Sequence, residues 1–303
     1  MISSGLRYQS LVSVIMPSLN QGEFIREAID SVLGQRFRRV ELIVVDGGSS
    51  DCTLSVLAEL AAQDSRLRWY SAEDHGPADA LNKGFLRARG TIFGWLNSDD
   101  YFTPGAIERS VQAFASSPDW LMVYGQGSHV DEAGQVLGRY PTSPPSVSLE
   151  KFAAGCFICQ PTVFFRRSMW TMLGGLDLGL RTAFDFDYWV RAFKSFPNRI
   201  GLVGEMQACS RLHDACITLR MRRTVAVEGM KVLARHFGWA PGHWLLTYME
   251  ELLRLPPNER GVVDLRAHMK EAMLEVSDYL RPLELETVRR IIDGDPRLNG
   301  SPI

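Results

Sequence analysis

Two adjacent carboxylates, Asp99 and Asp100, follow a short and almost wholly apolar run, residues 91–96. Such a run predicts a strand that is buried on both faces. Carboxylates at the C-terminal end of a buried strand lie where open α/β sheets bind ligands, and oxygen-rich clusters suit hard divalent cations that also hold a phosphate. The two residues could instead cap the next helix, for which Thr103-Pro104 offers an N-cap and a first-turn proline. The residue types alone leave both interpretations open.

The preceding residues supply the elements that must position these carboxylates. Apolar runs predict strands at residues 11–16, 40–45 and 67–70, and a fourth that begins at Ile92. Apolar positions at i, i+1, i+4 and i+5 predict a helix from Phe24 to Leu33, and further helices are expected at residues 52–62 and 78–89. This alternation predicts an α/β fold with a mostly parallel sheet and helices on both faces.

Polar residues recur at the ends of the expected strands, and the C-terminal ends of parallel strands share one edge of a sheet. We therefore expect one composite site at that edge. Its segments are Pro17-Ser18, Asp46-Gly47-Gly48-Ser49, Glu73-Asp74 and Asn97-Ser98-Asp99-Asp100.

The glycine loop after the second expected strand matches neither G-x-G-x-x-G nor G-x-x-x-x-G-K-[ST]. Asp46 directly follows a buried strand, so its carboxylate could accept a hydrogen bond from a base imide or a ribose hydroxyl. The glycines would let the backbone approach a ligand closely. A tight turn is the alternative, and Asp51 is expected to cap the following helix.

Four ordered segments resemble the family 2 glycosyltransferases: VSVIMPSLNQGEFIREAIDSVLGQ, ELIVVDGGSSDCT, EDHGPADALNKG and GWLNSDDY. The resemblance covers roughly the first two thirds of the chain. It implies an inverting enzyme of the GT-A fold that uses a nucleotide-sugar donor. It places Pro17 and Asp46 in the nucleoside pocket and Asp79 beside the base. Asn97-Ser98-Asp99 stands where the family has D-x-D, so Asp99 would bind Mg²⁺ or Mn²⁺ on the donor diphosphate.

Two departures from the family pattern affect this donor site. Asn97 replaces an aspartate that often contacts ribose, and an amide can still bond a hydroxyl there. Gly47 replaces the second aspartate of the commoner DDGS form, which removes one possible base contact and leaves the nucleotide open among UDP, GDP and dTDP. The resemblance adds His213 near the metal or diphosphate, beside Asp99 and Asp100 as ligands. A lone histidine is also often structural.

The residues on the acceptor side are predicted from a later segment of the chain. In the resembling family, this segment carries an acidic pair before an apolar helix. Phe184-Asp185 occupies that pair here, so the resemblance makes Asp185 the catalytic base, with Asp187 as the alternative. Both could simply be carboxylates favoured at a helix N-terminus, an effect of ~0.3–1 kcal/mol. Gln160 either faces the cleft, as in relatives, or merely begins a strand.

The chain changes character near residue 221, which predicts a catalytic domain at residues 1–220 and a helical extension at residues 221–303. Amphipathic helices are expected at residues 225–237, 244–255, 262–280 and 283–292. Trp239, Trp244 and Tyr248 could form an interfacial membrane face. Packing against the catalytic domain, or against a second subunit in a homodimer, is the interpretation we favour.

Composition limits the remaining possibilities. The 303 residues are 46% hydrophobic and 22% charged, as in ordinary globular proteins, and the net charge of −2 argues against a general nucleic-acid binder. The five cysteines form one isolated C-x-x-C, so we expect reduced thiols and no zinc. The first ten residues lack the apolar core of a signal peptide, and no run reaches the ~18 apolar residues of a membrane span. A cytoplasmic protein is expected, with peripheral contact at the inner face of the membrane possible.

The expected activity is transfer of a sugar from a nucleotide-diphosphate donor to a hydroxyl of a saccharide or lipid-linked acceptor. The resemblance further implies a role in surface polysaccharide or glycolipid assembly. Two other functions remain. A nucleotidyltransferase could share the sheet and metal, but it needs a basic triphosphate loop that is not evident near Gln21. A non-catalytic nucleotide-sugar-binding partner is compatible with the departures at Asn97 and Phe184.

Overall fold

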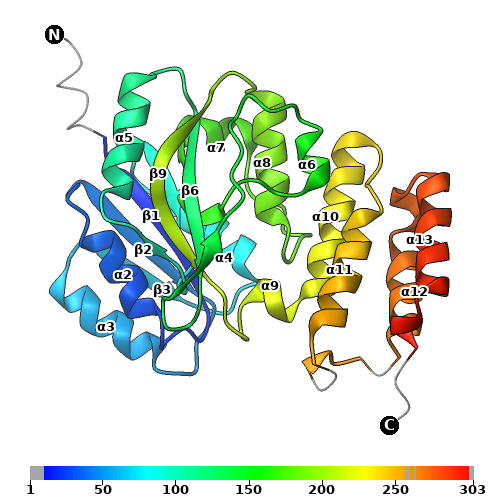
Figure 1. The fold of residues 1–303 in the computed structure, drawn as a ribbon. Coiled ribbons are helices and arrows are strands. Elements are labelled where there is room, and N and C mark those ends of the chain that lie inside the picture. The colour runs from blue at the N-terminus through cyan, green and yellow to red at the C-terminus, as the bar shows by residue number, and fades with distance from the viewer. Residues whose placement is uncertain (1–9, 257–258, 263, 300–303) are drawn as a thin grey trace. The chain divides into compact units, whose positions relative to one another are not determined.

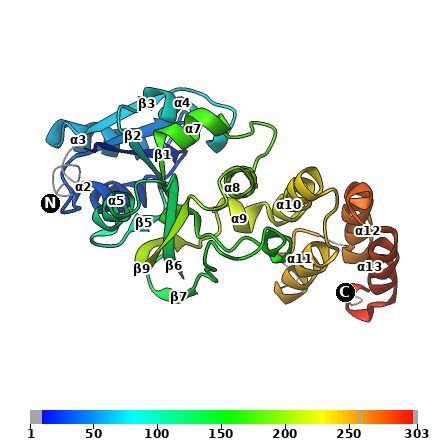
Figure 2. The same ribbon diagram turned by 90° about the horizontal axis from the view of Figure 1, so that it is seen from above.

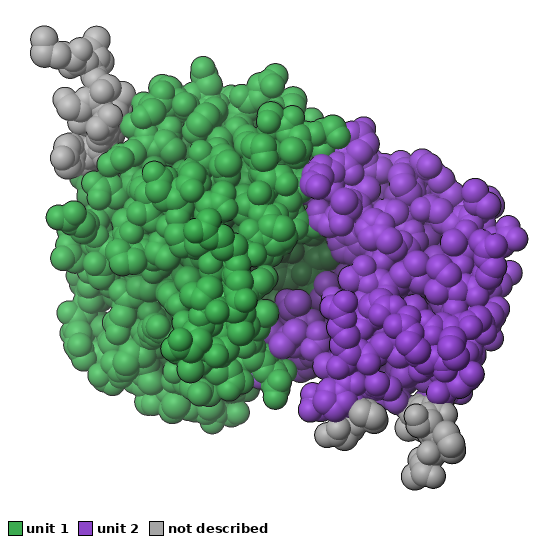
Figure 3. Space-filling model, viewed as in Figure 1, with its two compact units in different colours: residues 1–149, 156–214 green, residues 150–155, 215–303 purple. Residues whose placement is uncertain are grey.

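The fold is that of a computed structural model, which describes residues 10–256, 259–262 and 264–299. Residues 1–9, on which the expectation of no signal peptide mostly rests, lie outside the described residues. The chain forms two compact units, one of residues 1–149 and 156–214 and the other of residues 150–155 and 215–303 (Figure 3). The second unit thus begins six residues before the expected boundary and includes a short segment from the middle of the chain.

The first unit is built on a nine-stranded sheet, counted over the described residues (Figure 1). The strand order is β3-β2-β1-β4-β8-β6-β9-β5, and β7 pairs with β6. Pairing is parallel from β3 to β4 and between β6 and β9, and antiparallel elsewhere. The strands are β1 (Val12–Ser18), β2 (Val40–Asp46), β3 (Leu67–Ser71), β4 (Ile92–Trp95), β5 (Tyr101–Phe102), β6 (Met122–Val130), β7 (Val136–Arg139), β8 (Phe164–Arg166) and β9 (Ile200–Arg211).

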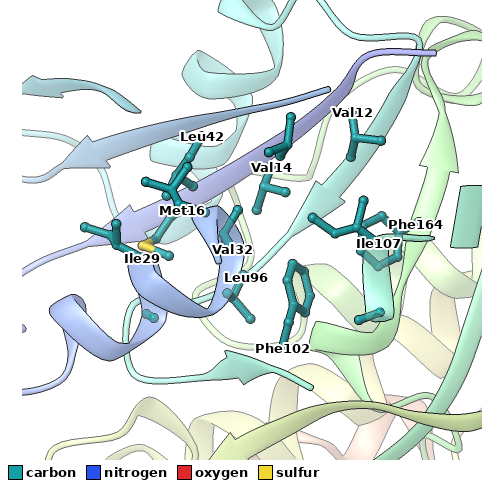
Figure 4. Close-up of a cluster of buried hydrophobic side chains, with 14 of the residues drawn as sticks. Val12, Val14, Met16, Ile29, Val32, Leu42, Leu96, Phe102, Ile107 and Phe164 are labelled. Atoms are coloured by element: carbon teal, nitrogen blue, oxygen red, sulfur yellow. The ribbon is translucent and has the colours of Figure 1, made fainter. Parts of the chain in front are cut away.

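Helices cover both faces of this sheet, as the alternating pattern predicts. In Figure 2, α2 and α5 lie on one side of the strands and α4 and α7 on the other. Alternate residues of β1 reach the two sides: Val14 packs in the cluster of Figure 4, while Ile15 contacts the α4 backbone at Gly84. The helices of this unit are α2 (Ile25–Leu33), α3 (Thr53–Gln63), α4 (Pro77–Arg87), α5 (Ala106–Ser116), α7 (Arg167–Leu173) and α8 (Phe184–Ser195), with a 3₁₀ turn η1 (Gln160–Thr162).

The expected helix start at Thr103-Pro104 is wrong. Helix α5 begins at Ala106, after Gly105 in a left-handed conformation with φ 84°. The Thr103 hydroxyl instead donates to the Met206 carbonyl at 2.6 Å, which fixes the segment to β9. Neither Asp99 nor Asp100 can cap a helix that starts this late.

The second unit is helical, as expected for the end of the chain. Its members are α6 (Lys151–Ala154), α9 (Ile217–Arg220), α10 (Arg222–Phe237), α11 (His243–Arg254), α12 (Leu265–Glu275), α13 (Pro282–Gly294) and the 3₁₀ turns η3 (Ser277–Tyr279) and η4 (Pro296–Leu298). The single helix expected at residues 262–280 is therefore α12 followed by η3, and residue 263 lies outside the described residues. None of the helices in the described part of the chain is long and apolar enough to cross a lipid bilayer.

The two tryptophans of this unit make specific contacts within it. The Trp244 indole donates to the Ala153 carbonyl at 2.8 Å, and its ring lies against Gly229, where an added Cβ would approach to 2.3 Å. The Arg281 guanidinium lies 3.8 Å from the centre of the Trp239 ring. These contacts favour a packing role for both rings.

Trp244→Ala should therefore lower the free energy of unfolding by about 3 kcal/mol, because the indole loses both its packing and its hydrogen bond. A thermal melt of the full chain measures this loss. Co-sedimentation with anionic vesicles provides the opposing test: a variant that melts normally but no longer binds vesicles would show that Trp244 faces lipid.

Candidate active site

Asp99 and His213 meet at the end of the sheet, although they lie 114 positions apart in the chain. The His213 Nε2 is 3.1 Å from the Asp99 Oδ2, and the two side chains are 4% and 16% exposed, respectively. The hydrogen bond to Asp99 raises the pKa of His213. The Phe24 ring, 4.7 Å away between ring centres, packs against the imidazole and limits its rotation.

This pair fits a divalent ion as a partial ligand set. Carboxylates and neutral imidazoles both bind divalent ions, but the 3.1 Å contact is a hydrogen bond here, so the proton between these atoms would have to leave before His213 Nε2 could bind a metal. No group of three or more His, Cys, Asp and Glu side chains that could hold a metal occurs among the residues that the structure describes. Phosphate oxygens would have to complete the coordination.

Asp100 points away from this pair and is buried. Its Oδ1 accepts from the Arg211 amide at 2.8 Å, and its Oδ2 accepts from the Asn97 amide group at 3.2 Å. Burial, and then the charge of Asp99, raise the pKa of Asp100 well above its usual range. The Asp100 carboxylate therefore joins the end of β9, through Arg211, to the loop after β4, through Asn97.

The Arg211 guanidinium holds this junction together. It donates to the carbonyls of Asp99, Asp131 and Glu132 and forms an ion pair with Glu27 of α2. Its side chain is only 3% exposed. The arrangement fixes the backbone on both sides of the Asp99–His213 pair.

Asn97 lies in a network of neutral side chains beside these carboxylates. Its Oδ1 accepts from the Trp95 indole at 3.0 Å, and its Nδ2 donates to Gln160 Oε1 at 3.1 Å as well as to Asp100. Gln160 in turn donates to the Trp95 carbonyl at 3.0 Å. Gln160 thus fixes the end of β4 and the orientation of Asn97.

Asp46 organises the loop after β2. Its fully buried carboxylate accepts from the amides of Gly48 and Ser49, at 3.0 and 2.9 Å, and from the hydroxyls of Ser49 and Ser71. Pro17 lies on the neighbouring strand, paired with Val45. The hydrogen bonds to Asp46 therefore fix the conformation of the loop after β2, which could approach a ligand.

The loop after β1 is fastened to this glycine loop. Asn20, with φ 53°, donates its amide to Ser49 Oγ at 2.7 Å and accepts from the Ser50 amide at 2.8 Å. Asp51 accepts from Gly22 and from Thr53 in the first turn of α3, each at 2.9 Å. Two strand-end loops thus form one surface.

Asp79 and Asp74 line the same edge at the start of α4. Asp79 forms an ion pair with Lys83 at 2.7 Å, and this bond lowers the pKa of Asp79. Burial raises the pKa of Asp74, whose carboxylate lies against Gly47: an added Cβ there would be 3.0 Å from Asp74 Oδ2. The side-chain space that Gly47 leaves open is thus occupied by Asp74.

Asp185 and Asp187 lie in the first turn of α8 but have different surroundings. Asp187 is 2% exposed and forms an ion pair with Arg191 at 2.8 Å, whose guanidinium also donates to the carbonyls of Leu173 and Gly175. Asp185 is partly buried and accepts from the Phe186 amide at 2.7 Å. Asp187 is therefore held in an ion pair with a structural role, whereas Asp185 is not part of that ion pair.

The surroundings of Asp185 suit a base. Burial raises its pKa to about 6, and the nearby groups that it influences are the Tyr140 hydroxyl and the Cys156 thiol, whose pKa values its charge raises. The preceding residue, Phe184, stacks on Trp95 of β4 with 5.4 Å between ring centres. This contact places the start of α8 beside the strand that leads to Asn97.

A family model described as glycosyl transferase family 2 matches residues 13–170, more than half of the 303-residue chain. The chain belongs to this family.

The related proteins and structures support the fold of this glycosyltransferase. Chondroitin synthase of Escherichia coli is 29% identical over 195 residues, 64% of this chain and 28% of the synthase. Residues 1–349 of Staphylococcus aureus TarS, in complex with UDP-GlcNAc, match with a TM-score of 0.60 at 18% identity, covering 93% of this chain and 91% of that one. The mannosyltransferase PcManGT of Pyrobaculum calidifontis, in complex with GDP-Man and Mn²⁺, matches with a TM-score of 0.58 at 19% identity, covering 96% and 82%.

These findings confirm the expected GT-A fold and the family of the enzyme. Family membership also decides against the nucleotidyltransferase alternative. The chain spans about a third of the length of several curated relatives that it matches.

Two residues on which the site of this glycosyltransferase depends carry little signal in the sequence. Arg211 is the first, because an arginine gives no signal of burial until its partners are known. Asp74 was noted only as part of a polar strand end, although the missing side chain at Gly47 was a usable signal that another group fills that space.

The raised pKa of Asp185 predicts a pH-dependent effect of Asp185→Asn on stability. With a folded-state pKa of about 6 and an ordinary value of 3.8, the buried charge costs nothing below pH 3.8 and its full amount above pH 6. The variant should therefore be more stable than the wild type at pH 8, by on the order of 3 kcal/mol, with the difference vanishing near pH 4.

Chemical denaturation at both pH values measures this difference. Asp187→Asn is the matched control and should destabilise the protein at pH 8, because it breaks the ion pair with Arg191. An Asp185→Asn variant that is no more stable than the wild type at pH 8 would contradict the desolvated environment.

Proposed function

We propose that this glycosyltransferase moves a sugar from a nucleotide-diphosphate donor to an acceptor hydroxyl, with a divalent ion and with inversion at the anomeric carbon. The observation that carries the proposal is the meeting of Asp99 and His213, two residue types that bind divalent ions, at the edge where sheets of this kind bind ligands. Asp100 would have to give up its bonds to Arg211 and Asn97 to join them, so we assign it a positioning role.

Asp99 and His213 would hold Mg²⁺ or Mn²⁺, which would stabilise the negative charge that develops on the leaving diphosphate. The nucleoside would lie against the joined loops after β1 and β2, shaped by Asp46 and Pro17. Asp79, which pairs with Lys83 and whose charge acts on Asp74, would border the base. A role for Asn97 towards the ribose requires a change of partner, since its amide is already bonded within the protein.

Asp185 would remove the proton from the acceptor hydroxyl as that oxygen attacks C1 from the side opposite the diphosphate. The oxygen–C1 bond forms, the C1–phosphate oxygen bond breaks, and the proton ends on Asp185. A pKa of about 6 leaves the carboxylate ionised at neutral pH yet more basic than an ordinary aspartate. Asp187 is poorly suited to accept this proton because its carboxylate is already paired with Arg191.

The substrate class draws on the similar proteins. TarS was solved with UDP-GlcNAc and PcManGT with GDP-Man and Mn²⁺, so UDP- and GDP-linked sugars are the first donors to test. Chondroitin synthase among the relatives favours a saccharide or lipid-linked acceptor in polysaccharide assembly. Such a role is compatible with a cytoplasmic enzyme that contacts the membrane peripherally or pairs with a second copy through its terminal helices.

The function can be tested directly with these nucleotide sugars. A donor at 100 times its dissociation constant should stabilise the protein by about 2.7 kcal/mol, measured as a thermal shift with and without Mn²⁺. Single-turnover hydrolysis of the donor that binds then separates an enzyme from a protein that only binds. Binding without any release of nucleoside diphosphate would contradict the catalytic assignment.

Asp99→Ala should abolish Mn²⁺-dependent donor binding while leaving the melting temperature close to that of the wild type, because this partly exposed carboxylate contributes little packing. Isothermal titration with UDP or GDP and Mn²⁺ measures the effect. Asp30→Ala, on the exposed side of α2, is the control. Unchanged affinity in the Asp99 variant would remove this residue from the metal site.

Asp185→Asn should lower kcat by ~10²–10⁴ with an unchanged donor Kd, since the amide keeps the shape but cannot accept a proton. In the wild type, turnover should fall as the pH drops below about 6, where Asp185 becomes protonated. Steady-state rates across pH 5 to 8 check both statements. If Asp185→Asn remains active and Asp187→Asn is inactive, the base is Asp187; if both remain active, the inverting assignment fails.

A further inference from the structure

The loop of residues 174–183, between α7 and α8, leads directly into the helix start that carries Asp185. Asn82, on α4, makes two hydrogen bonds to one residue of this loop: its Nδ2 donates to the Leu176 carbonyl at 3.0 Å, and its Oδ1 accepts from the Leu176 amide at 2.9 Å. Leu176 is 4% exposed. One side-chain amide therefore satisfies both polar backbone groups of a buried loop residue.

The neighbouring loop residue is shaped for this contact. A Cβ added at Gly175 would lie 2.9 Å from the Asn82 Oδ1, closer than the amide could tolerate without moving. Arg191 also holds this part of the chain, because its guanidinium donates to the carbonyls of Leu173 and Gly175, but Arg191 belongs to α8 itself. Asn82 thus ties the loop to a different helix.

That helix also contributes to the donor side. Asp79 and Lys83 form their ion pair on α4, within one turn of Asn82, and Gly84 of the same helix packs on Ile15 of β1. Helix α4 is therefore fixed to the centre of the sheet. Through Asn82, it provides a rigid reference for the loop that precedes the acceptor-side base.

We propose that Asn82 is a positioning residue for Asp185: its paired bonds to Leu176 hold the loop before α8 against α4, and so fix the base relative to the donor side of the site. The inference rests on the proposed function, because it takes Asp185 as the base. Asn82 itself touches neither the acceptor nor the reacting atoms in this role. It acts on the rate only through the loop.

The loop held by Asn82 also affects the surroundings of Asp185. The titratable groups that Asp185 influences from other elements are Tyr140 and Cys156, while Asp187 and Arg191 of its own helix bond each other. Burial rather than a neighbouring charge is the main cause of its raised pKa. A loosened loop would admit water and move the pKa of Asp185 towards its ordinary value.

Asn82→Ala removes both bonds, and Asn82→Asp keeps the shape but places an oxygen against the Leu176 carbonyl. We expect both variants to lose about tenfold to a hundredfold in kcat, since small misplacements of a reacting group have effects of this size. Donor Kd should stay within about twofold. The assay is nucleoside diphosphate release from UDP-GlcNAc or GDP-mannose with Mn²⁺, and Leu86→Ala, at a 78% exposed position of α4, is the matched control.

Two further readouts separate positioning from general damage. Hydrogen exchange at residues 174–184 should accelerate at least about tenfold in Asn82→Ala and not in Leu86→Ala, a measurement that needs no substrate. The acidic limb of the pH–rate profile should also move to lower pH. Unchanged exchange of this loop, or wild-type kcat in Asn82→Ala while Asp185→Asn is inactive, would overturn the role of Asn82 alone. An active Asp185→Asn would instead overturn the proposed function.

Discussion

The buried guanidinium of Arg211 is the interaction on which the end of the sheet depends. It binds three carbonyls from two loops and the exposed carboxylate of Glu27 on α2, so removing it would take one shared donor from four acceptors. His213 lies two residues further along the chain, so the same contact that closes β9 against α2 also brings the imidazole to Asp99.

Asp46 has the corresponding role at the end of β2. Its carboxylate is fully buried and accepts from four donors, three in the loop after β2 and one at the end of β3, so this buried polar group is fully hydrogen-bonded. The loop after β1 then fastens onto Ser49, which also bonds Asp46. The backbone of these two joined loops, where we propose that the nucleoside lies, is consequently held in place by the protein's own hydrogen bonds.

The first hundred residues allowed the fold to be predicted because buried strands and amphipathic helices alternate there with clear punctuation. The ordered motifs also located the composite edge. The sequence could not indicate that Thr103 bonds β9 rather than capping α5, because that partner lies about a hundred residues away. For the same reason the two bonds of Asn82 to Leu176 are invisible in the sequence, where Asn82 is one polar residue on an ordinary helix.

Two pairs of carboxylates show how neighbouring acids acquire different roles in one site. Asp99 and Asp100 are adjacent, yet Asp99 bonds the buried imidazole of His213 while Asp100 accepts from a backbone amide. Asp185 and Asp187 are two positions apart on a helix, about 200° around its axis. Only one of them can therefore face Arg191 and the loop before α8. Asp185, which has no cationic partner among the described residues, is the acid whose burial raises its pKa, and that combination is what general-base catalysis at neutral pH requires.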